Sequence, residues 1–303
     1  MITLLSTWTF GLALALVALG VFVSYRLFSF PDITTDGSFT LGAVVAAVLL
    51  TAGCDPTLAT LGGMAAGGLA GCTTALLHAF LGVERLLAGI LVTTALASVN
   101  LVVLGRSNVP LFGTTTLLDQ AESRIGPVFE RTGLSAALAG EAARLAFVLG
   151  VVGLAIALLW AFFRTQLGTA MRAGGDTPTM ARALGRNTGG MTLAGLAIAN
   201  ALTALSGAMV SQYQGFADVQ MGIGMVVWGM ASVFLGAALV GPVRLGGALV
   251  ATAAGSVTFR LLVAAALRAG LDPDWLKAAT AVVVLAALVA PRFLTRGAHA
   301  RTH

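Results

Sequence analysis

The sequence predicts an all-α protein, a polytopic bundle of about nine or ten transmembrane helices. Three observations carry this prediction. Hydrophobic residues make up 58% of the 303-residue chain, and charged residues make up only 10% of it. The mean hydropathy is +0.95. Soluble domains contain about 25% charged and about 45–50% apolar residues, so this composition excludes an ordinary soluble enzyme, a disordered chain and a nucleic-acid-binding protein.

Nine apolar segments account for the predicted spans. A helix needs about 20 residues to cross the hydrocarbon core of a bilayer, and the hydrophobic residues suffice for roughly nine such helices. The 17 Lys and Arg are thinly spread, so the net charge of +5 does not indicate a surface for polyanions. We expect spans at residues 7–25, 38–53, 57–80, 86–104, 137–163, 190–212, 221–241, 245–267 and 275–291.

The positive charges predict the orientation of the chain. If the C-terminus is cytoplasmic, ten Arg fall in the inside connections and five Arg or Lys fall in the outside connections, while Arg144 and Arg260 lie within spans. Cytoplasmic connections of membrane proteins carry the excess of Lys and Arg. This count favours an external N-terminus and a cytoplasmic C-terminus.

Two connections are long. Residues 105–136 should form an external, irregular or partly helical loop, and residues 164–189 should form a cytoplasmic loop. The other connections are short, so we expect residues 1–303 to form a single transmembrane domain without a separate soluble part.

The second apolar segment begins unusually. Residues 32–43 read DITTDGSFTLGA, and the apolar run of about fifteen residues is short for a span, which favours a broken or half-membrane helix. A similar irregular start occurs within residues 213–236. Phe30-Pro31-Asp32-Ile33 stands at the start of the second apolar segment. Phe216-Ala217-Asp218-Val219 stands at the start of the segment within residues 213–236. The pattern predicts two pseudo-repeated halves, each with a discontinuous helix.

Small residues mark the third segment. Gly63, Gly67 and Gly71 recur at four-residue spacing. Such a stripe lets two helix backbones approach closely in lipid. Helix packing is the main interpretation, and a narrow pore wall is the alternative.

Polar residues inside apolar segments are candidates for a translocation path, because ionisable groups in a membrane usually face the bundle interior or water. Asp36, at the start of the short helix, is also a possible helix cap. Glu141 and Arg144 are one turn apart and should pair, and Asn100 and Asn200 should bridge helices rather than touch a solute. Arg260 could snorkel, pair with an acid or line the path. The path candidates are Asp36, Ser38, Thr40, Asn100, Gln212 and Arg260.

The cytoplasmic connection predicts a short helix between two spans. After a break at Gly174-Gly175, Asp176 or Thr177 can cap a helix with Pro178 near its first turn, and Gly185 can end it. Either it rests on lipid headgroups, or it docks on a cytoplasmic partner. Its residues are Asp176, Thr177, Pro178, Met180, Ala181, Arg182, Ala183, Leu184 and Gly185.

The stretch from Thr169 to Gly215 resembles the cytoplasmic loop and following helix of ABC importer permeases in the branched-chain amino acid and ribose transporter superfamily. The matching residues are Arg172-Ala173-Gly174-Gly175-Asp176, Met180-Ala181, Leu184-Gly185 and Ser206-Gly207. The segment DITTDGSFTLGA resembles the broken-helix motif of the subgroup paired with tryptophan- or tyrosine-type binding proteins. The chain departs from the sugar branch at this motif and has one fewer N-terminal span.

This resemblance implies a permease subunit of an ABC importer in the bacterial inner membrane. It would act as a pair, with a homodimer expected first, together with two cytoplasmic ATPase subunits and an external solute-binding protein. The helix around Ala181 would couple the permease to an ATPase, which would hold the ATP and Mg²⁺. An amino acid, with an aromatic one favoured, is the first choice of substrate, and a nucleoside or sugar is the second.

The residues agree with a subunit that depends on partners. Lys277 is the lone lysine and lies outside any GxxxxGK[ST] loop, so this chain should not bind ATP itself. The sequence contains no HExxH, no DDxxD run and no Ser-His-acid set, and its histidines are scattered, so we expect neither an enzyme nor a metal site. A secondary, ion-coupled transporter with inverted repeats is the alternative, because broken helices are also typical of that class.

Overall fold

The computed structural model describes residues 1–270, apart from residues 132, 177–186 and 242, together with residue 282. Eight of the nine predicted spans are helices, and the ninth, at residues 275–291, lies outside the described residues. The helices are α1 (Ile2–Val21), continued by the π-helix η1 (Phe22–Leu27), α2 (Thr34–Thr51), α3 (Pro56–Ala79), α4 (Arg85–Leu104), α6 (Ala136–Phe162), α9 (Thr188–Gln214), α10 (Met225–Val240) and α11 (Leu245–Arg268). Seven of the described helices are long and apolar enough to cross a membrane, and α10, with 16 residues, is shorter.

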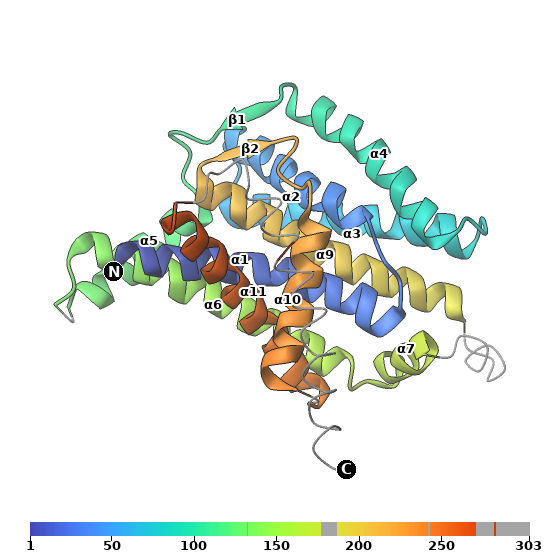
Figure 1. Ribbon diagram of the computed structural model, residues 1–303. Helices are drawn as coiled ribbons and strands as arrows, with labels where there is room; N and C mark the ends of the chain where they lie inside the picture. Colours follow the sequence, from blue (N-terminus) through green and yellow to red (C-terminus); the bar gives the residue numbers. More distant parts are fainter. Residues whose placement is uncertain (132, 177–186, 242, 271–281, 283–303) are drawn as a thin grey trace, which may run out of the picture.

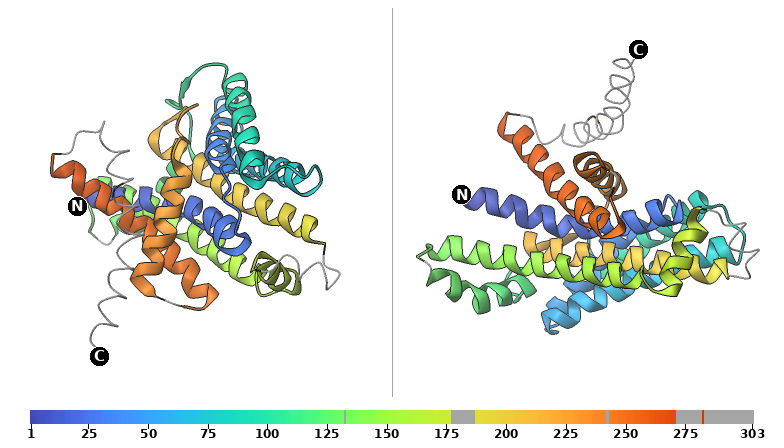
Figure 2. Two further views of the ribbon diagram at one scale, coloured as in Figure 1. Left: turned by 45° about the vertical axis from the view of Figure 1, so that its right-hand side comes forward. Right: turned by 90° about the horizontal axis from the view of Figure 1, so that it is seen from below.

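The connections gather at two ends of the bundle (Figures 1 and 2). At one end, β1 (Asn108–Pro110) pairs antiparallel with β2 (Phe216–Asp218), with Val109 opposite Ala217. The N-terminus and α5 (Leu117–Glu130) lie at this end, which we call the strand end. At the other end lies α7 (Gln166–Asp176), beside the last turns of α3 and the first turns of α4 and α9. We call this the α7 end.

Helix α9 forms the centre of the bundle, with α1, α2 and α3 packed around it. Its most buried apolar residues join those of α1 in one core, which includes Leu16, Leu19, Leu196 and Met209. The glycines of α3 make the close contact that the sequence predicts. A Cβ at Gly67 would overlap Ala204 of α9, and one at Gly71 would overlap the carbonyl oxygen of Leu196. The stripe is therefore a packing surface.

The link between α1 and α2 is irregular, as the sequence predicts. Helix α1 ends in the wider π-turns of η1, and Ser29 then takes a φ of +50°, which is unusual for a residue with a side chain. Helix α2 begins at Thr34, four residues before the predicted start at 38. The polar residues Asp36 and Ser38 suggested a later start, but both lie in the first two turns of the helix.

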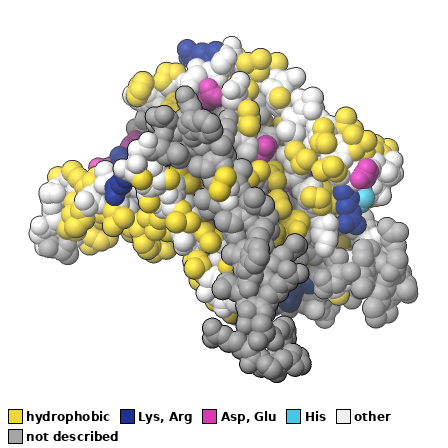
Figure 3. All heavy atoms as spheres, viewed as in Figure 1, with side chains coloured by type: hydrophobic (Ala, Val, Ile, Leu, Met, Phe, Trp, Pro, Cys, Tyr) yellow, Lys and Arg dark blue, Asp and Glu magenta, His cyan; other side chains and the backbone are white. Residues whose placement is uncertain are grey.

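Much of the surface is apolar, which fits a protein surrounded by lipid (Figure 3). Helix α4 is an example. Ala88, Val92 and Leu96 are buried, whereas Ile90, Leu91 and Val102 on the rest of the helix are exposed.

Candidate functional site

Helix α2, whose 18 residues are enough for a span, and the shorter helix α10 meet at Asp36. Its carboxylate oxygens accept hydrogen bonds from the backbone N–H groups of Gly224, at 3.0 Å, and Val226, at 2.8 Å. These N–H groups belong to the first turn of α10, where helical N–H groups have no partner within the helix. Asp36 is thus a helix cap, as the alternative interpretation proposed, but it caps α10 rather than its own helix.

Thr40, one turn further along α2, strengthens the same junction. Its hydroxyl accepts a hydrogen bond from the N–H of Gly222 at 3.1 Å and donates one to the carbonyl of Asp36. A Cβ at Gly222 would overlap that carbonyl, so only glycine fits here. Gly224 has a φ of +91°, a conformation that glycine adopts without strain. The backbone before α10 is therefore held against α2 by polar contacts.

A second buried polar cluster joins the start of α2 to the middle of α9. The Asn200 amide donates to the carboxylate of Asp32 at 2.7 Å, and the Thr34 N–H donates to its other oxygen at 2.9 Å. The Thr34 hydroxyl lies 2.7 Å from that of Thr74 on α3. Asp32, Thr34, Thr74 and Asn200 are all almost fully buried. No Lys or Arg within 4 Å of Asp32 is found in the described part of the chain.

The sequence reasoning predicted a bridging role for Asn200, and the structure confirms it. Asp32 belongs to the motifs at residues 30–33 and 32–43, but it was not among the predicted site residues. The signal that could have found it is its position directly before the helix start, together with Pro31, where a short polar side chain commonly binds backbone N–H groups.

Ser38 and Asn100 lie near this junction. The Asn100 amide of α4 donates to the carbonyl of Gly37 at 3.3 Å, while the Asn100 side-chain oxygen is buried without a partner in the described structure. The Ser38 hydroxyl is likewise buried and unpartnered there. Buried polar atoms without partners are uncommon, so each of these two can still accept a hydrogen bond from a bound molecule such as water.

Gln212 lies elsewhere, near the strand end. Its side-chain N–H₂ donates to the hydroxyl of Thr60 on α3 at 2.8 Å, and its side-chain oxygen accepts from the N–H of Leu117 at 2.8 Å. Leu117 is the first residue of α5. Gln212 therefore holds three elements together, with its donor and acceptor both in use.

Arg260 of α11 lies over the ring of Phe10 on α1, with its guanidinium 4.2 Å from the ring centroid. The face of an aromatic ring attracts a cation. Its Nε is buried without a hydrogen-bond partner among the described residues. Of the three interpretations left open, pairing with an acid finds no support in the described structure, since no carboxylate lies within 4 Å of it.

Arg144 pairs with more acids than the sequence predicted. It lies 3.9 Å from Glu141, its expected partner, but 2.7 Å from Glu122 and 3.4 Å from Asp119, both on α5. Glu141 instead accepts hydrogen bonds from Thr9 at 3.0 Å and Tyr213 at 2.9 Å. Arg144 therefore ties α5 to α6, while Glu141 ties α6 to α1 and α9.

The cytoplasmic connection corrects one prediction. Helix α7 runs through Gly174 and Gly175 and ends at Asp176, so these glycines do not break the helix before Asp176. The helix predicted to follow, with Asp176 or Thr177 as its cap, lies outside the described residues. Glycine costs about 1 kcal/mol in a helix interior, and this cost is tolerable near a helix end. The remaining predicted coupling residues lie outside the described part: Thr177, Pro178, Met180, Ala181, Arg182, Ala183, Leu184 and Gly185.

Comparison with known proteins identifies the chain. Residues 3–290 match the family described as the permease component of branched-chain amino acid transport systems. The chain belongs to this family. It is a multi-pass membrane permease, the membrane subunit of an ABC-type importer, and not an enzyme. The match decides against the secondary transporter.

Two curated relatives are similar in sequence to the permease. The tyrosine transport system permease protein of Clostridioides difficile (strain R20291) is 36% identical over 285 residues, which cover 94% of this chain and 90% of that protein. The uncharacterised protein RP368 of Rickettsia prowazekii (strain Madrid E) is 29% identical over 220 residues, covering 72% and 71% of the two chains.

A solved structure confirms the fold of the permease. PsaBC from Streptococcus pneumoniae, in complex with Fab, superposes with a TM-score of 0.54 and 14% identity, covering 93% of this chain and 89% of that one. At this identity the likeness concerns the fold alone.

The structure brings four of the six path candidates of the permease toward one junction. Asp36, Ser38 and Thr40 share the first turns of α2, and Asn100 binds the backbone between them at Gly37. Gln212 and Arg260 serve contacts with other elements. The candidate site is therefore the junction of α2, α4 and α10. The Asp32–Asn200 cluster lies next to it, where α2 begins.

Proposed function

We propose that the permease imports an aromatic amino acid, L-tyrosine first, across the inner membrane of a bacterium by ATP-driven alternating access. The relative named as a tyrosine transport permease supports this substrate class, since it matches 94% of the chain. The subgroup resemblance of residues 32–43 points to the same substrate class.

The partners follow from the same reasoning. Two copies of the permease act with two cytoplasmic ATPase subunits and an external solute-binding protein. The absence of a GxxxxGK[ST] loop from the sequence supports a separate chain for ATP and Mg²⁺. In this arrangement residues 105–136 face the binding protein and residues 164–189 face the ATPases.

The observation that carries the mechanism is the Asp36 junction. Discontinuous helices in transporters place helix ends inside the bundle, where backbone groups can face a solute or water. Asp36 binds N–H groups at the start of α10, and Thr40 binds the N–H of Gly222 just before it, so the starts of α2 and α10 move together. We propose that closure of the ATPases displaces the 164–189 loop and α9, and that α9 shifts this junction through the Asn200–Asp32 hydrogen bond.

Transport in reconstituted vesicles tests the proposal. Permease, ATPase and binding protein are placed in proteoliposomes, and uptake of labelled L-tyrosine is measured with ATP, with a non-hydrolysable ATP analogue, and in competition with L-leucine and ribose. We expect uptake of L-tyrosine to require ATP hydrolysis. We expect L-leucine and ribose to inhibit this uptake only weakly. Uptake of ribose in preference to L-tyrosine would overturn the substrate. Co-purification of two differently tagged permease copies tests the homodimer.

A further inference from the structure

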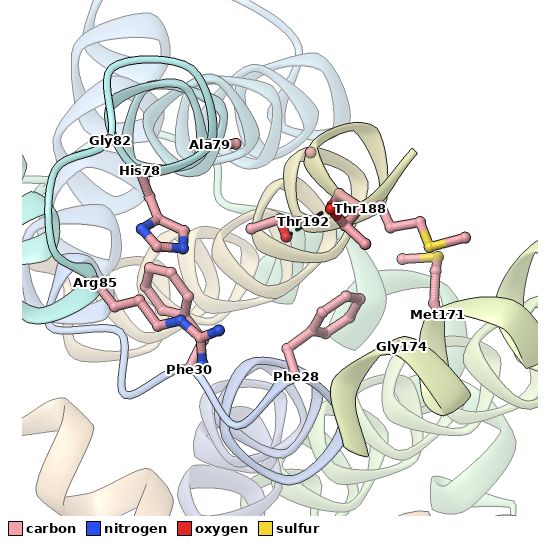
Figure 4. Close-up of a pocket in the computed structure, with 12 residues that line it drawn as sticks. Phe28, Phe30, His78, Ala79, Gly82, Arg85, Met171, Gly174, Thr188 and Thr192 are labelled. Atoms are coloured by element: carbon pink, nitrogen blue, oxygen red, sulfur yellow. Dashed lines mark hydrogen bonds between the residues drawn. The ribbon is translucent and has the colours of Figure 1, made fainter. Parts of the chain in front are cut away.

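A cavity of about 340 Å³ opens at the α7 end of the bundle (Figure 4). It lies where α3 ends and where α4 and α9 begin, and residues of α7 line one side of it. Sites for small molecules typically enclose about 300–1,000 Å³, so the cavity can hold a small polar group. Arg85 is the one Arg or Lys among its described lining residues, and none of them is an Asp or Glu. The cavity therefore favours an anion.

The depth of the cavity matches the headgroup layer of a bilayer. Helix α3 ends at Ala79 and helix α4 begins at Arg85, and both helices are long and apolar enough to cross a membrane. The polar headgroups of lipids lie just beyond the hydrocarbon core that such helices span. A cavity between the ends of α3 and α4 is therefore level with the lipid phosphates.

Exposed apolar side chains begin directly beside the cavity. Leu76 is 43%, Phe80 64% and Leu81 71% exposed at the end of α3. The ring of Phe80 lies 3.9 Å from the position that a Cβ at Gly189 would take, and Gly189 lines the cavity. A lipid whose headgroup occupied the cavity could therefore lay an acyl chain along this surface.

Arg85 supplies the positive charge. Its guanidinium donates to the carbonyl of Ser29 at 3.1 Å. No Asp or Glu lies within 4 Å of Arg85 in the described part of the chain. A guanidinium has five N–H donors, and two of them in parallel suit a phosphate. Because the contact with Ser29 leaves donors over, Arg85 can bind a phosphate group in the cavity.

The start of α9 reinforces the attraction for an anion. Figure 4 shows Thr188 and Thr192 of this helix across the cavity from His78 and Arg85. Gly189, in the first turn, also lines the cavity. The first N–H groups of a helix carry partial positive charge, and anions commonly bind there. A phosphate in the cavity would thus meet favourable charge from α4 on one side and from α9 on the other.

His78 and Thr192 add acceptors for hydroxyl groups. The Nδ1 of His78 lies 2.8 Å from the carbonyl oxygen of Val83, and a carbonyl only accepts, so the proton is assigned to Nδ1. In the neutral ring Nε2 then keeps its lone pair and can accept a hydrogen bond. The Thr192 hydroxyl donates to the carbonyl of Thr188 at 3.0 Å, so its oxygen can accept as well. The cavity therefore suits a group that carries both a phosphate and hydroxyls.

An anionic phospholipid with a glycerol headgroup combines these properties. Phosphatidylglycerol carries a phosphate, headgroup hydroxyls and acyl chains. Phosphatidylcholine carries the same phosphate, but its headgroup ends in a cation that has no N–H or O–H donor and that Arg85 would repel. Basic pockets between transmembrane helices on the cytoplasmic side typically bind anionic headgroups, and the α7 end is the end expected to face the cytoplasm.

We propose that this cavity binds the headgroup of an anionic phospholipid of the phosphatidylglycerol type. The phosphate lies on Arg85, a headgroup hydroxyl donates to Nε2 of His78, and an acyl chain follows the exposed surface beside Phe80. The lipid then joins α4 to α9, because Arg85 belongs to the first and Gly189 to the second. The proposal holds whichever solute the permease imports.

Competition between two lipids tests the ligand class. The whole chain is purified, stripped of its own lipids in detergent, and mixed with equal amounts of phosphatidylglycerol and phosphatidylcholine. Native mass spectrometry then measures which lipid stays bound. We expect phosphatidylglycerol to be preferred about fivefold or more, which is the effect of one Arg near an anionic lipid. Equal binding of the two lipids would overturn the proposal.

Three variants locate the bound lipid. Arg85→Gln removes the charge, and Ala79→Leu fills the cavity while Arg85 stays in place, so each should abolish the preference for phosphatidylglycerol. Arg26→Gln is the matched control and should keep the preference, because Arg26 is exposed at the end of η1 and does not line the cavity. An unchanged preference in both Arg85→Gln and Ala79→Leu would place the lipid elsewhere and refute the site. An equal loss in Arg26→Gln would show only a general attraction of charges, and would refute it too.

Competition with inorganic phosphate distinguishes a lipid from a soluble phosphate ion, and it needs no variant to fold. Inorganic phosphate is added to the unmodified permease with phosphatidylglycerol bound, and NaCl at the same ionic strength is the control. We expect phosphate to release no more lipid than NaCl does, because it lacks the acyl chain that contacts the surface beside Phe80. Release of the lipid by phosphate but not by NaCl would assign the cavity to a soluble phosphate and overturn the lipid proposal.

Discussion

The carboxylate of Asp36 on α2 accepts a hydrogen bond from the backbone N–H of Val226 on α10 at 2.8 Å, across 190 positions of sequence. Its second oxygen accepts from Gly224. One side chain therefore satisfies two N–H groups at the start of a helix from the other half of the chain. The hydrogen bond to Val226 is partly buried, so water cannot replace it freely if Asp36 is lost, whereas the bond to Gly224 is exposed.

Two substitutions at Asp36 test its hydrogen bonds to α10 and its charge. Asparagine has one acceptor oxygen, so Asp36→Asn keeps one of the two bonds to α10 and loses the charge, at a cost of about 1–3 kcal/mol. We expect ATP-dependent uptake to fall while the amount of permease in the membrane stays near normal. Asp36→Ala removes the acceptor of both N–H groups and leaves the partly buried N–H of Val226 without a side-chain partner, so we expect lower abundance as well as lower uptake.

Asp55 offers a matched control. It caps its own helix, α3, by accepting from Thr57 at 2.8 Å, and that hydrogen bond lowers the pKa of Asp55. Because Asp55 is exposed and asparagine caps helices about as well as aspartate, Asp55→Asn should keep uptake and abundance unchanged. Normal uptake in Asp36→Asn would show that the second bond and the charge are dispensable.

The glycine stripe of α3 gives a stability prediction. Gly67 faces Ala204 and the carbonyl of Asn200 without room for a Cβ, whereas a Cβ at Gly68 would make ordinary contacts at 3.5 and 3.6 Å with α9. We expect Gly67→Ala to destabilise the permease by about 1–3 kcal/mol through overpacking, and Gly68→Ala to be near neutral. Thermal unfolding of the two variants in the same detergent measures the difference. A similar unfolding temperature for both would contradict this packing.

The spans could be predicted from the sequence, because each depends on a local property, a run of apolar residues about as long as the bilayer is thick. The Gly63–Gly71 stripe could also be predicted, because it depends on the local spacing of small residues along one helix. The Asp36–Val226 contact could not be predicted. A cap is normally sought within three residues of the carboxylate, and nothing local to Asp36 indicates that its N–H donors lie in another helix.

Arg144 shows a similar limit. Its spacing from Glu141 predicted a pair one turn apart, but Glu122 competes from α5, at 2.7 Å, once the external loop folds back on α6. The sequence around Gly174 and Gly175 predicted a break in the helix that the structure does not have. Glycine pairs favour breaks, but α7 continues through this pair and ends one residue later, at Asp176, where the cost of two glycines near a helix end is small.

Labelling with an impermeant thiol reagent tests the orientation. Ser123 lies on α5 at the strand end, and Thr188 begins α9 at the α7 end. In a background with Cys54→Ser and Cys72→Ala, we expect Ser123→Cys to react on intact cells and Thr188→Cys to react only after lysis. The reverse order would invert the orientation derived from the positive charges. Restored Cys54, which is exposed between α2 and α3, should label like Ser123→Cys and serves as an internal check.

The coupling role is tested at Ala181, which lies outside the described residues, so the prediction depends on the sequence. In a helix that inserts into a groove of the ATPase, the small and apolar residues Met180, Ala181 and Leu184 would be buried in the contact. Ala181→Glu would then bury an unpaired charge, which is strongly unfavourable. We expect the permease to insert normally and the ATPase subunits to be lost on purification, or binding-protein-stimulated ATP hydrolysis to disappear.

The matched control for Ala181→Glu is Arg186→Gln, which changes charge by one unit in the same segment. Charges at the rim of an interface mainly tune association rate and salt dependence, so this variant should keep the ATPase subunits bound at moderate salt. Co-purification and stimulated ATP hydrolysis are measured for both variants beside the unmodified permease. A fully assembled Ala181→Glu complex with normal stimulated hydrolysis would exclude Ala181 from the contact, and the ATPases would have to act on the permease through another surface.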